Sequence, residues 1–166
     1  MAEAVNPIPE GYHTITPALI VNDARAALEF YKRAFGATIL AVADGPSGKV
    51  IHAAFKIGDS MLMLADEFPE WGSVAPRSAG GKQSMSLHIY VNDADAAFKR
   101  AVDAGATVVM PLADAFWGDR YGQVTDPYGH KWSIGTHKKD LSREEMEKAQ
   151  AETFAKMGGG CGPDKK

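Results

Sequence analysis

Two histidines on apolar, strand-like segments, His52 and His88, have the side-chain chemistry best suited to catalysis or binding at neutral pH. Imidazole titrates near that pH, so it can act as a general acid or base or as a metal ligand. If Ala53, Phe55 and Ile57 form the buried side of their strand, His52 lies on the opposite side, toward a cleft. A histidine on a strand is more often structural than catalytic, so both are candidates rather than assignments.

The segment Phe-Trp-Gly-Asp-Arg-Tyr that ends at Tyr121 gathers three aromatic side chains around one glycine. Trp117 and Tyr121 could form a wall or lid over a small organic ligand. Arg120 could then bind a carboxylate or phosphate of that ligand. The alternative is a loop held in place by its own aromatic side chains, with Arg120 paired to Asp119 or Asp114.

The composition excludes several classes of partner. The net charge is −3 and the 18 lysines and arginines form no basic stripe, so neither nucleic acid nor an anionic membrane is expected as a partner. No glycine-rich phosphate loop joins a strand to a helix, and no cofactor is predicted. The first residues lack the basic and apolar parts of a secretory signal, so a soluble, cytoplasmic protein is the expectation. Two further histidines, His13 and His130, are expected at the surface.

The elements that must position these side chains occur twice along the chain. The pattern Val-Asn-Asp-Ala-x-Ala-Ala at residues 21–27 returns at 91–97, and Gly-Ala-Thr at 36–38 returns at 105–107. In each copy an apolar strand runs into Asn-Asp, a helix-start signal, and strand-like segments follow the helix. The chain therefore predicts two βαβββ modules, with a ligand cleft where the copies meet.

Neither half could bury a stable core alone, so the chain is predicted to fold as a single domain. The predicted parts are module one at 12–67, a linker at 68–83, module two at 84–137, a C-terminal helix at 138–158 and a flexible tail at 159–166. Ser142 and Glu145 have capping-box spacing for that helix. Its apolar side, which includes Met146 and Phe154, needs a covering surface on its own modules or on a second subunit. The single cysteine, Cys161, lies in the glycine-rich tail, where no intrachain disulfide is possible.

Tandem βαβββ modules carrying VNDAxAALEFYKRAFGA in the first copy, and VNDADAAFKRAVDAGA and DPYGHKWSI in the second, resemble the vicinal oxygen chelate superfamily. That superfamily includes glyoxalase I, bleomycin-resistance proteins, fosfomycin-resistance enzymes and extradiol dioxygenases. The phrases MLADEFPEWG, SLHIYVND and FWGDRYGQVTDPYGHKWS resemble its PhnB-like branch more narrowly. The resemblance covers about residues 12–137. It implies an α+β fold with two curved sheets around a cleft and often a homodimer, but no particular reaction.

Metal-dependent members of that superfamily place one histidine, glutamine or glutamate ligand on the first and last strands of each module. The matching positions in this sequence hold Thr16, Met63, Ser86 and Ser133. None of these suits a divalent first-row metal, so no metal site is predicted. His52 and His88 could instead form a displaced site. Its carboxylate would come from Asp66 or Glu67, which gives the two-histidine, one-carboxylate arrangement known for iron.

Two classes of function remain open. The first is a metal-independent binder of a small, largely apolar or aromatic molecule in the cleft, as the bleomycin-resistance proteins are. The second is a glyoxalase-type enzyme, a lyase, isomerase or dioxygenase, with a non-standard metal or with His88 or His52 as the catalytic residue. The predicted ligand-binding residues on the cleft side are Thr16, His52, Met61, Met63, Ser86, His88, Trp117, Arg120, Tyr121 and Ser133. A homodimer is expected, and the sequence does not identify the ligand.

Overall fold

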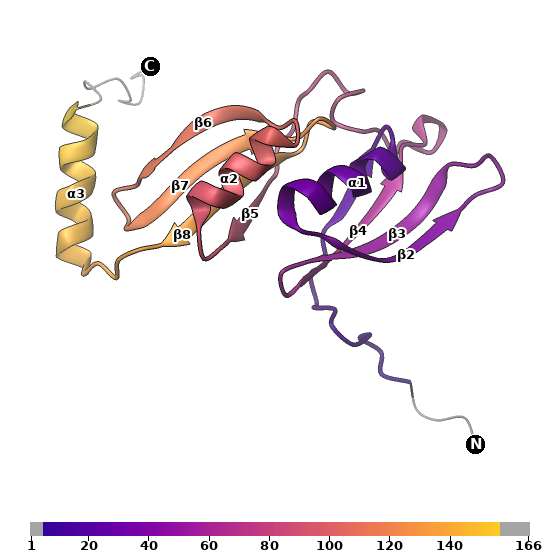
Figure 1. Ribbon diagram of the computed structural model, residues 1–166, viewed down its shortest axis with the longest axis horizontal. Helices are drawn as coiled ribbons and strands as arrows, with labels where there is room; N and C mark the ends of the chain where they lie inside the picture. The colour runs from indigo at the N-terminus through magenta and orange to yellow at the C-terminus, as the bar shows by residue number, and fades with distance from the viewer. Residues whose placement is uncertain (1–4, 157–166) are drawn as a thin grey trace, which may run out of the picture.

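The computed structural model describes residues 5–156, which form two βαβββ modules followed by a helix (Figure 1). Module one contains β1 (Ala18–Val21), α1 (Ala24–Phe35), β2 (Thr38–Asp44), β3 (Val50–Ile57) and β4 (Ser60–Asp66). Module two contains β5 (Ser86–Tyr90), α2 (Ala94–Asp103), β6 (Thr107–Asp114), β7 (Asp119–Thr125) and β8 (Lys131–His137). A 3₁₀ turn, η1 (Pro69–Trp71), lies between the modules, and α3 (Arg143–Lys156) follows them. The predicted α+β fold with tandem modules and a C-terminal helix is confirmed.

Each module forms one four-stranded mixed sheet, and the two sheets have the same topology. The strand orders are β1-β4-β3-β2 and β5-β8-β7-β6, and in each sheet the first and last strands of the module pair in parallel. Ala18 lies opposite Met63 in the first sheet, and His88 lies opposite Ser133 in the second. The sequence repeat is therefore a structural repeat, in which His88 and Ser133 take the places of Ala18 and Met63.

Both Asn-Asp pairs start helices, as the repeat predicts. The side chain of Asp23 accepts a hydrogen bond of 3.0 Å from the backbone N–H of Ala26, and Asp93 accepts the same bond from Ala96. Such N-caps satisfy donors that have no partner within the helix. Gly36, with a φ of 68°, ends α1 in the left-handed conformation that glycine adopts without a steric penalty.

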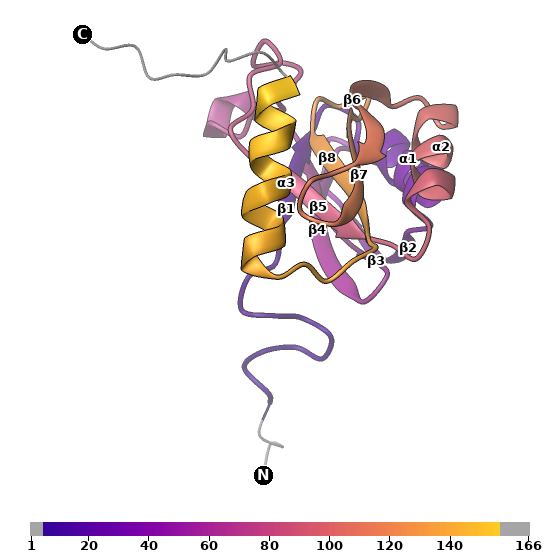
Figure 2. The ribbon, with the colours of Figure 1, turned by 90° about the vertical axis from the view of Figure 1, so that its left-hand side faces the viewer.

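A single hydrophobic core joins the two modules. The modules lie side by side with α1 and α2 on the same side of the two sheets (Figures 1 and 2). Tyr31 stacks on Phe55 within module one at 5.4 Å between ring centroids, and Phe35 meets Trp132 of module two at 4.6 Å. On β3 the predicted core set of Ala53, Phe55 and Ile57 is buried and His52 is exposed on the other side, although Ala54 of that side is buried as well. The face of each sheet opposite the helices is called the open face below.

Asp126 is a buried acceptor at the junction of the modules. Its carboxylate accepts hydrogen bonds from the Tyr31 hydroxyl at 2.8 Å and from the Trp132 indole N–H at 2.9 Å. It also accepts two backbone N–H bonds within its own turn, from Tyr128 and His130, both at 2.9 Å. Burial, together with the neighbouring Asp126 carboxylate, raises the pKa of Tyr31 well above its usual value, so this phenol stays a donor.

His130 is not the surface residue that the sequence predicts, because it is only 4% exposed. Its Nε2 lies 2.9 Å from the carbonyl oxygen of Ile20 and therefore donates to it. Its Nδ1 lies 2.8 Å from the side-chain amide nitrogen of Gln83. The imidazole thus links a turn of module two to β1 of module one. A single-sequence pattern contains no signal for a contact across 110 residues.

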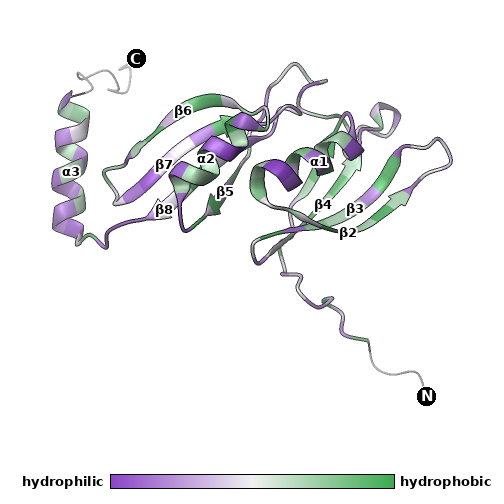
Figure 3. Cartoon of the chain, viewed as in Figure 1, coloured by the Kyte–Doolittle hydropathy of each residue, from purple (hydrophilic) through white to green (hydrophobic). Residues whose placement is uncertain are grey.

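The C-terminal helix lies at the end of module two away from module one (Figure 1). Its capping box forms as predicted, since the Ser142 hydroxyl accepts from the Glu145 N–H and the Glu145 carboxylate accepts from the Ser142 N–H. No residue of α3 is buried, and Figure 3 shows this helix as largely hydrophilic. Its Phe154 ring centroid lies 6.1 Å from that of Phe116.

No helix among residues 5–156 is long and apolar enough to cross a membrane. The C-terminal helix begins at Arg143 rather than at residue 138 as predicted, and residues 157–166, including Cys161, lie outside the described part.

Candidate ligand-binding site

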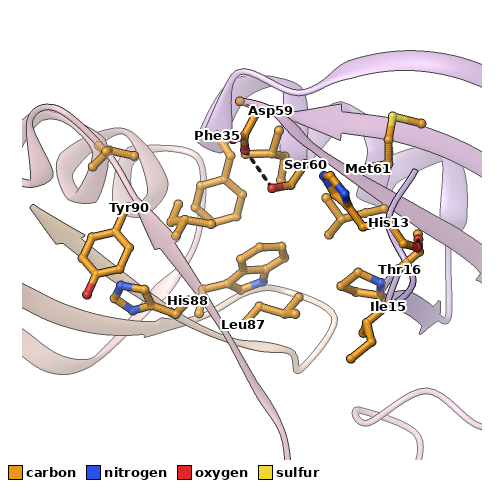
Figure 4. Close-up of a pocket in the computed structure, with 18 of the residues that line it drawn as sticks. His13, Ile15, Thr16, Phe35, Asp59, Ser60, Met61, Leu87, His88 and Tyr90 are labelled. Carbon is orange, nitrogen blue, oxygen red and sulfur yellow. Dashed lines mark hydrogen bonds between the residues drawn. The ribbon is translucent and has the colours of Figure 1, made fainter. Parts of the chain in front are cut away.

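A pocket of about 650 Å³ lies where the two modules meet (Figure 4). It is bounded by the segment that precedes β1, by the β3–β4 hairpin and by β5. His88 and Tyr90 lie at one end, and His13, Thr16 and Met61 lie at the other (Figure 4). Its apolar walls include Phe35, Ile57, Met61, Leu62, Leu87 and Trp132. The pocket is therefore mainly apolar, with a few polar groups at its ends.

Apart from Arg120, the structure distributes the predicted ligand-binding residues over four places. Those that line the pocket are Thr16, Met61 and His88. His52 and Met63 lie on the open face of the first sheet, outside the pocket lining. Ser133, Tyr121 and Trp117 gather around His88 on the open face of the second sheet. Ser86 starts β5 opposite Lys131 and does not line the pocket.

His88 lies within an aromatic and hydroxyl environment. Its Nδ1 is 2.8 Å from the Ser133 hydroxyl, and its ring centroid is 4.3 Å from that of Tyr90 and 5.9 Å from that of Tyr121. A Cβ atom at Gly135 would lie 3.0 Å from the imidazole, so glycine makes room for the ring. Burial lowers the pKa of His88 below its usual value, and the charge of Asp119 only partly opposes this. The imidazole is therefore mainly neutral at pH 7.

Asp119 is the functional-site candidate that the sequence reasoning missed. It is 4% exposed and accepts hydrogen bonds from the Tyr90 hydroxyl at 3.1 Å, the Trp117 indole N–H at 3.0 Å and His137 Nδ1 at 2.7 Å. Burial opposes its ionisation, but these three bonds outweigh burial and hold the pKa of Asp119 below its usual value. Strand alternation back from Tyr121 would have placed Asp119 on the same open face.

The predicted aromatic loop is a tight turn between β6 and β7. The Ala115 N–H donates to the Asp119 carbonyl at 2.7 Å, and the Gly118 N–H donates back to the Ala115 carbonyl at 3.0 Å. The Trp117 ring lies 5.2 Å from that of Tyr121 in an edge-to-face contact. The loop is thus held by its own side chains, since the Trp117 indole N–H also donates to Asp119 at 3.0 Å, whereas a wall or lid over a ligand stays a prediction.

Arg120 does not have the role that the sequence suggested for it. Its guanidinium forms two hydrogen bonds to Asp95 of α2, at 2.9 and 3.1 Å, and lies 3.4 Å from Asp114. Arg120 is thus directed to the helix side of its sheet, opposite to Tyr121 and Asp119 on the same strand. This corrects the prediction that it binds a ligand anion. The alternative pairing with Asp114 is present, but the main partner is Asp95.

The donor set does not fit the metal that many members of the superfamily hold. The displaced site is wrong, because the Asp66 carboxylate is buried and accepts the N–H groups of Ala24 and Val50, both at 2.7 Å. Glu67 is likewise bound, to the Ala75 N–H and the Ser78 hydroxyl, both at 2.9 Å. Within residues 5–156, no group of three or more His, Cys, Asp or Glu side chains could hold a metal ion.

Comparisons with known proteins agree with this fold. The model of the Glyoxalase/Bleomycin resistance protein/Dioxygenase superfamily matches residues 12–134. An uncharacterised protein of Mycobacterium bovis is 44% identical over 140 residues, which cover 82% of this chain and 91% of that protein. The crystal structure of TioX from Micromonospora sp. ML1 is 28% identical, with a TM-score of 0.57 over 75% of this chain and 98% of TioX. The PhnB protein from Bacillus cereus, 23% identical, shares the fold, with a TM-score of 0.58 over 75% of this chain and 99% of PhnB. The chain therefore belongs to the glyoxalase/bleomycin-resistance/dioxygenase superfamily, the vicinal oxygen chelate family, and shares its fold with the PhnB protein.

Proposed function

We propose that this protein is a metal-independent binder of a small, largely apolar or aromatic molecule, which it holds in the pocket between its modules. The pocket itself carries the proposal. Its volume of about 650 Å³ lies in the range of sites that enclose drug-sized ligands. Such sites combine mainly apolar walls with a few polar groups that orient the ligand, and this pocket has that composition.

The walls and the polar ends have different roles in this proposal. Met61 and Leu87 contribute affinity through apolar burial, and the flexible thioether of Met61 adapts to the shape of the ligand. His88 fixes a polar group of the ligand by a hydrogen bond at one end of the pocket, and Thr16 offers a second hydrogen-bonding group at the other end. Because His88 Nδ1 already contacts Ser133, Nε2 is the ring nitrogen that faces a ligand.

The binding probe is 8-anilinonaphthalene-1-sulfonate, an aromatic molecule with one polar group whose fluorescence rises in apolar sites. Replacing Met61 by alanine is expected to weaken its affinity about tenfold, because part of the apolar wall is lost. The matched control is Met85→Ala, since Met85 is 49% exposed and does not line the pocket. Equal affinities of the two variants, measured by fluorescence titration, would show that the probe binds elsewhere.

A glyoxalase-type enzyme is the alternative, and the contact between His88 and Ser133 favours it. A largely neutral imidazole beside a pocket is the state that a general base requires. The His88→Gln variant separates the two functions. For a binder this change alters affinity only modestly, whereas for an enzyme it abolishes turnover of any substrate found.

We further propose that the second copy of this chain is a partner of the site. Tyr90 and Met110 lie on the open face of the second sheet, and they are 66% and 46% exposed. His52 and Met63 lie on the corresponding face of the first sheet. A twofold dimer that packs these faces together would enclose a cleft and include these predicted residues in it. A cytoplasmic location also remains a prediction.

Light scattering of the purified protein is expected to give about twice the chain mass of 17.8 kDa. The physical reason is that association removes exposed apolar groups of both sheets from water. A monomer at micromolar concentration contradicts the dimer. It does not affect the pocket within one chain, because both modules of one chain line that pocket.

A further inference from the structure

A continuous chain of hydrogen bonds leads from the pocket to solvent through Asp119. Tyr90 lines the pocket and donates to the Oδ2 atom of Asp119 at 3.1 Å. The Oδ1 atom of the same carboxylate lies 2.7 Å from His137 Nδ1, and His137 Nε2 lies 3.1 Å from Asp140. The side chain of His137 is 53% exposed and that of Asp140 is fully exposed, whereas that of Asp119 is 4% exposed. A buried carboxylate thus connects an exposed histidine to the pocket.

Two aromatic side chains converge on one oxygen of this carboxylate. The Trp117 indole N–H donates to Oδ2 at 3.0 Å, beside the Tyr90 hydroxyl. The ring centroid of Tyr90 lies 4.3 Å from that of His88, and the ring centroid of Trp117 lies 5.2 Å from that of Tyr121. The placement of these rings beside the pocket and on the open face therefore depends on how firmly Asp119 is held.

We infer that Asp119 is a positioning residue for Tyr90 at the ligand pocket and for Trp117 on the open face, and that protonation of His137 controls how firmly it holds both side chains. The inference rests on the proposed function for its effect on binding. A protonated imidazole donates from both nitrogens, so it binds Asp119 and Asp140 at once through charge-assisted bonds. A neutral imidazole has one N–H and must lose one of these bonds.

The charged groups around His137 set the direction of this dependence. Asp119 faces it from β7, and Asp140 faces it from the segment before α3. The adjacent Arg120 of β7 is paired with Asp95 and Asp114. Hydrogen bonds to Asp119 and then Asp140 raise the pKa of His137 above its usual 6.5. The protonated His137 therefore holds Asp119 most firmly at a pH below this raised pKa. The bond between His137 and Asp119 weakens as the pH rises through the pKa of His137.

The first experiment follows the indole N–H resonances in a pH titration from about pH 5.5 to about pH 8.5, where histidine titrates. The Trp117 resonance, assigned with Trp117→Phe, is expected to shift with the same midpoint as the His137 ring. Trp71, which is 75% exposed, and Trp132, which donates to Asp126, are internal controls within the same spectrum. In His137→Gln the Trp117 shift should disappear. A Trp117 resonance that ignores the midpoint of His137 overturns the inference.

The second experiment measures the affinity for 8-anilinonaphthalene-1-sulfonate across the same pH range. Asp119→Asn is expected to weaken binding about tenfold, because an amide cannot accept from three donors. In the unchanged protein the affinity is expected to decrease as the pH rises through the raised pKa of His137. In Asp119→Asn and in His137→Gln this decrease should be lost. The control Asp103→Asn changes an exposed carboxylate of α2 and should keep that decrease.

The outcomes separate the inference from the proposed function. If Met61→Ala leaves probe affinity unchanged but the Trp117 resonance still follows His137, the proposed pocket fails and the positioning by Asp119 stands. If Met61→Ala weakens binding and retains the pH dependence, while Asp119→Asn and His137→Gln lose it, both stand. A pH dependence that persists in Asp119→Asn and His137→Gln overturns the inference. Since His137 is half-exposed, its variant tests the link even if Asp119→Asn does not fold.

Discussion

Replacement of Asp126 by alanine is expected to lower the free energy of unfolding by about 3–5 kcal/mol. The variant leaves the Tyr31 hydroxyl and the Trp132 indole N–H as buried donors without their acceptor. Each such donor costs about 1–3 kcal/mol, and the turn that ends at His130 loses two further bonds. The effect is large because Tyr31 comes from module one and Trp132 from module two, so the junction of the modules is weakened.

Urea denaturation followed by circular dichroism measures this loss. Asp93→Ala is the matched control, because it removes an exposed N-cap aspartate and should cost only about 1 kcal/mol. If the two variants lose similar stability, the Asp126 cluster does not hold the modules together. A normal fold with a much lower denaturation midpoint only for Asp126→Ala is the expected result.

Replacement of Gly118 by alanine is expected to cost about 2–4 kcal/mol of stability. Gly118 has a φ of 98°, which disfavours any side chain, and a Cβ atom there would collide with the carbonyl oxygen of Lys139. The turn must then shift. This shift strains the hydrogen bonds that the Gly118 carbonyl accepts from the N–H groups of Lys138 and Lys139, both at 3.0 Å. Trp117 and Asp119 flank this glycine, so the aromatic side chains of the open face shift with the turn.

Gly48→Ala separates backbone strain from the collision. Gly48 has a similar φ of 79°, but a Cβ atom there meets nothing within 4 Å. It should therefore lose only about 1 kcal/mol in thermal or urea unfolding. Equal losses for the two glycines would mean that the collision with the Lys139 carbonyl adds no cost beyond backbone strain.

The sequence alone determined the repeated architecture, because the signals for it are local. Asp23 and Asp93 stand directly before their helices, where a short acceptor satisfies free backbone N–H groups. The alternation around Phe55 separates the buried side of β3 from the side that carries His52. Capping of α3 by Ser142 follows the same local rule. Periodicity, caps and turns act over a few residues, so they can be recognised without knowledge of distant segments.

Only the tertiary structure decided which side chains meet. Asp126 reaches Tyr31 across 95 residues, and Arg120 reaches Asp95 rather than a ligand because α2 packs on its side of the sheet. The position of Asp119 on β7 could be inferred from alternation, but its binding to Tyr90 and His137 depends on strands that are separate in the sequence. These contacts arise from the packing of two sheets and two helices into one core. Many sequence-compatible arrangements share the same local periodicity, so the pattern cannot determine such long-range contacts.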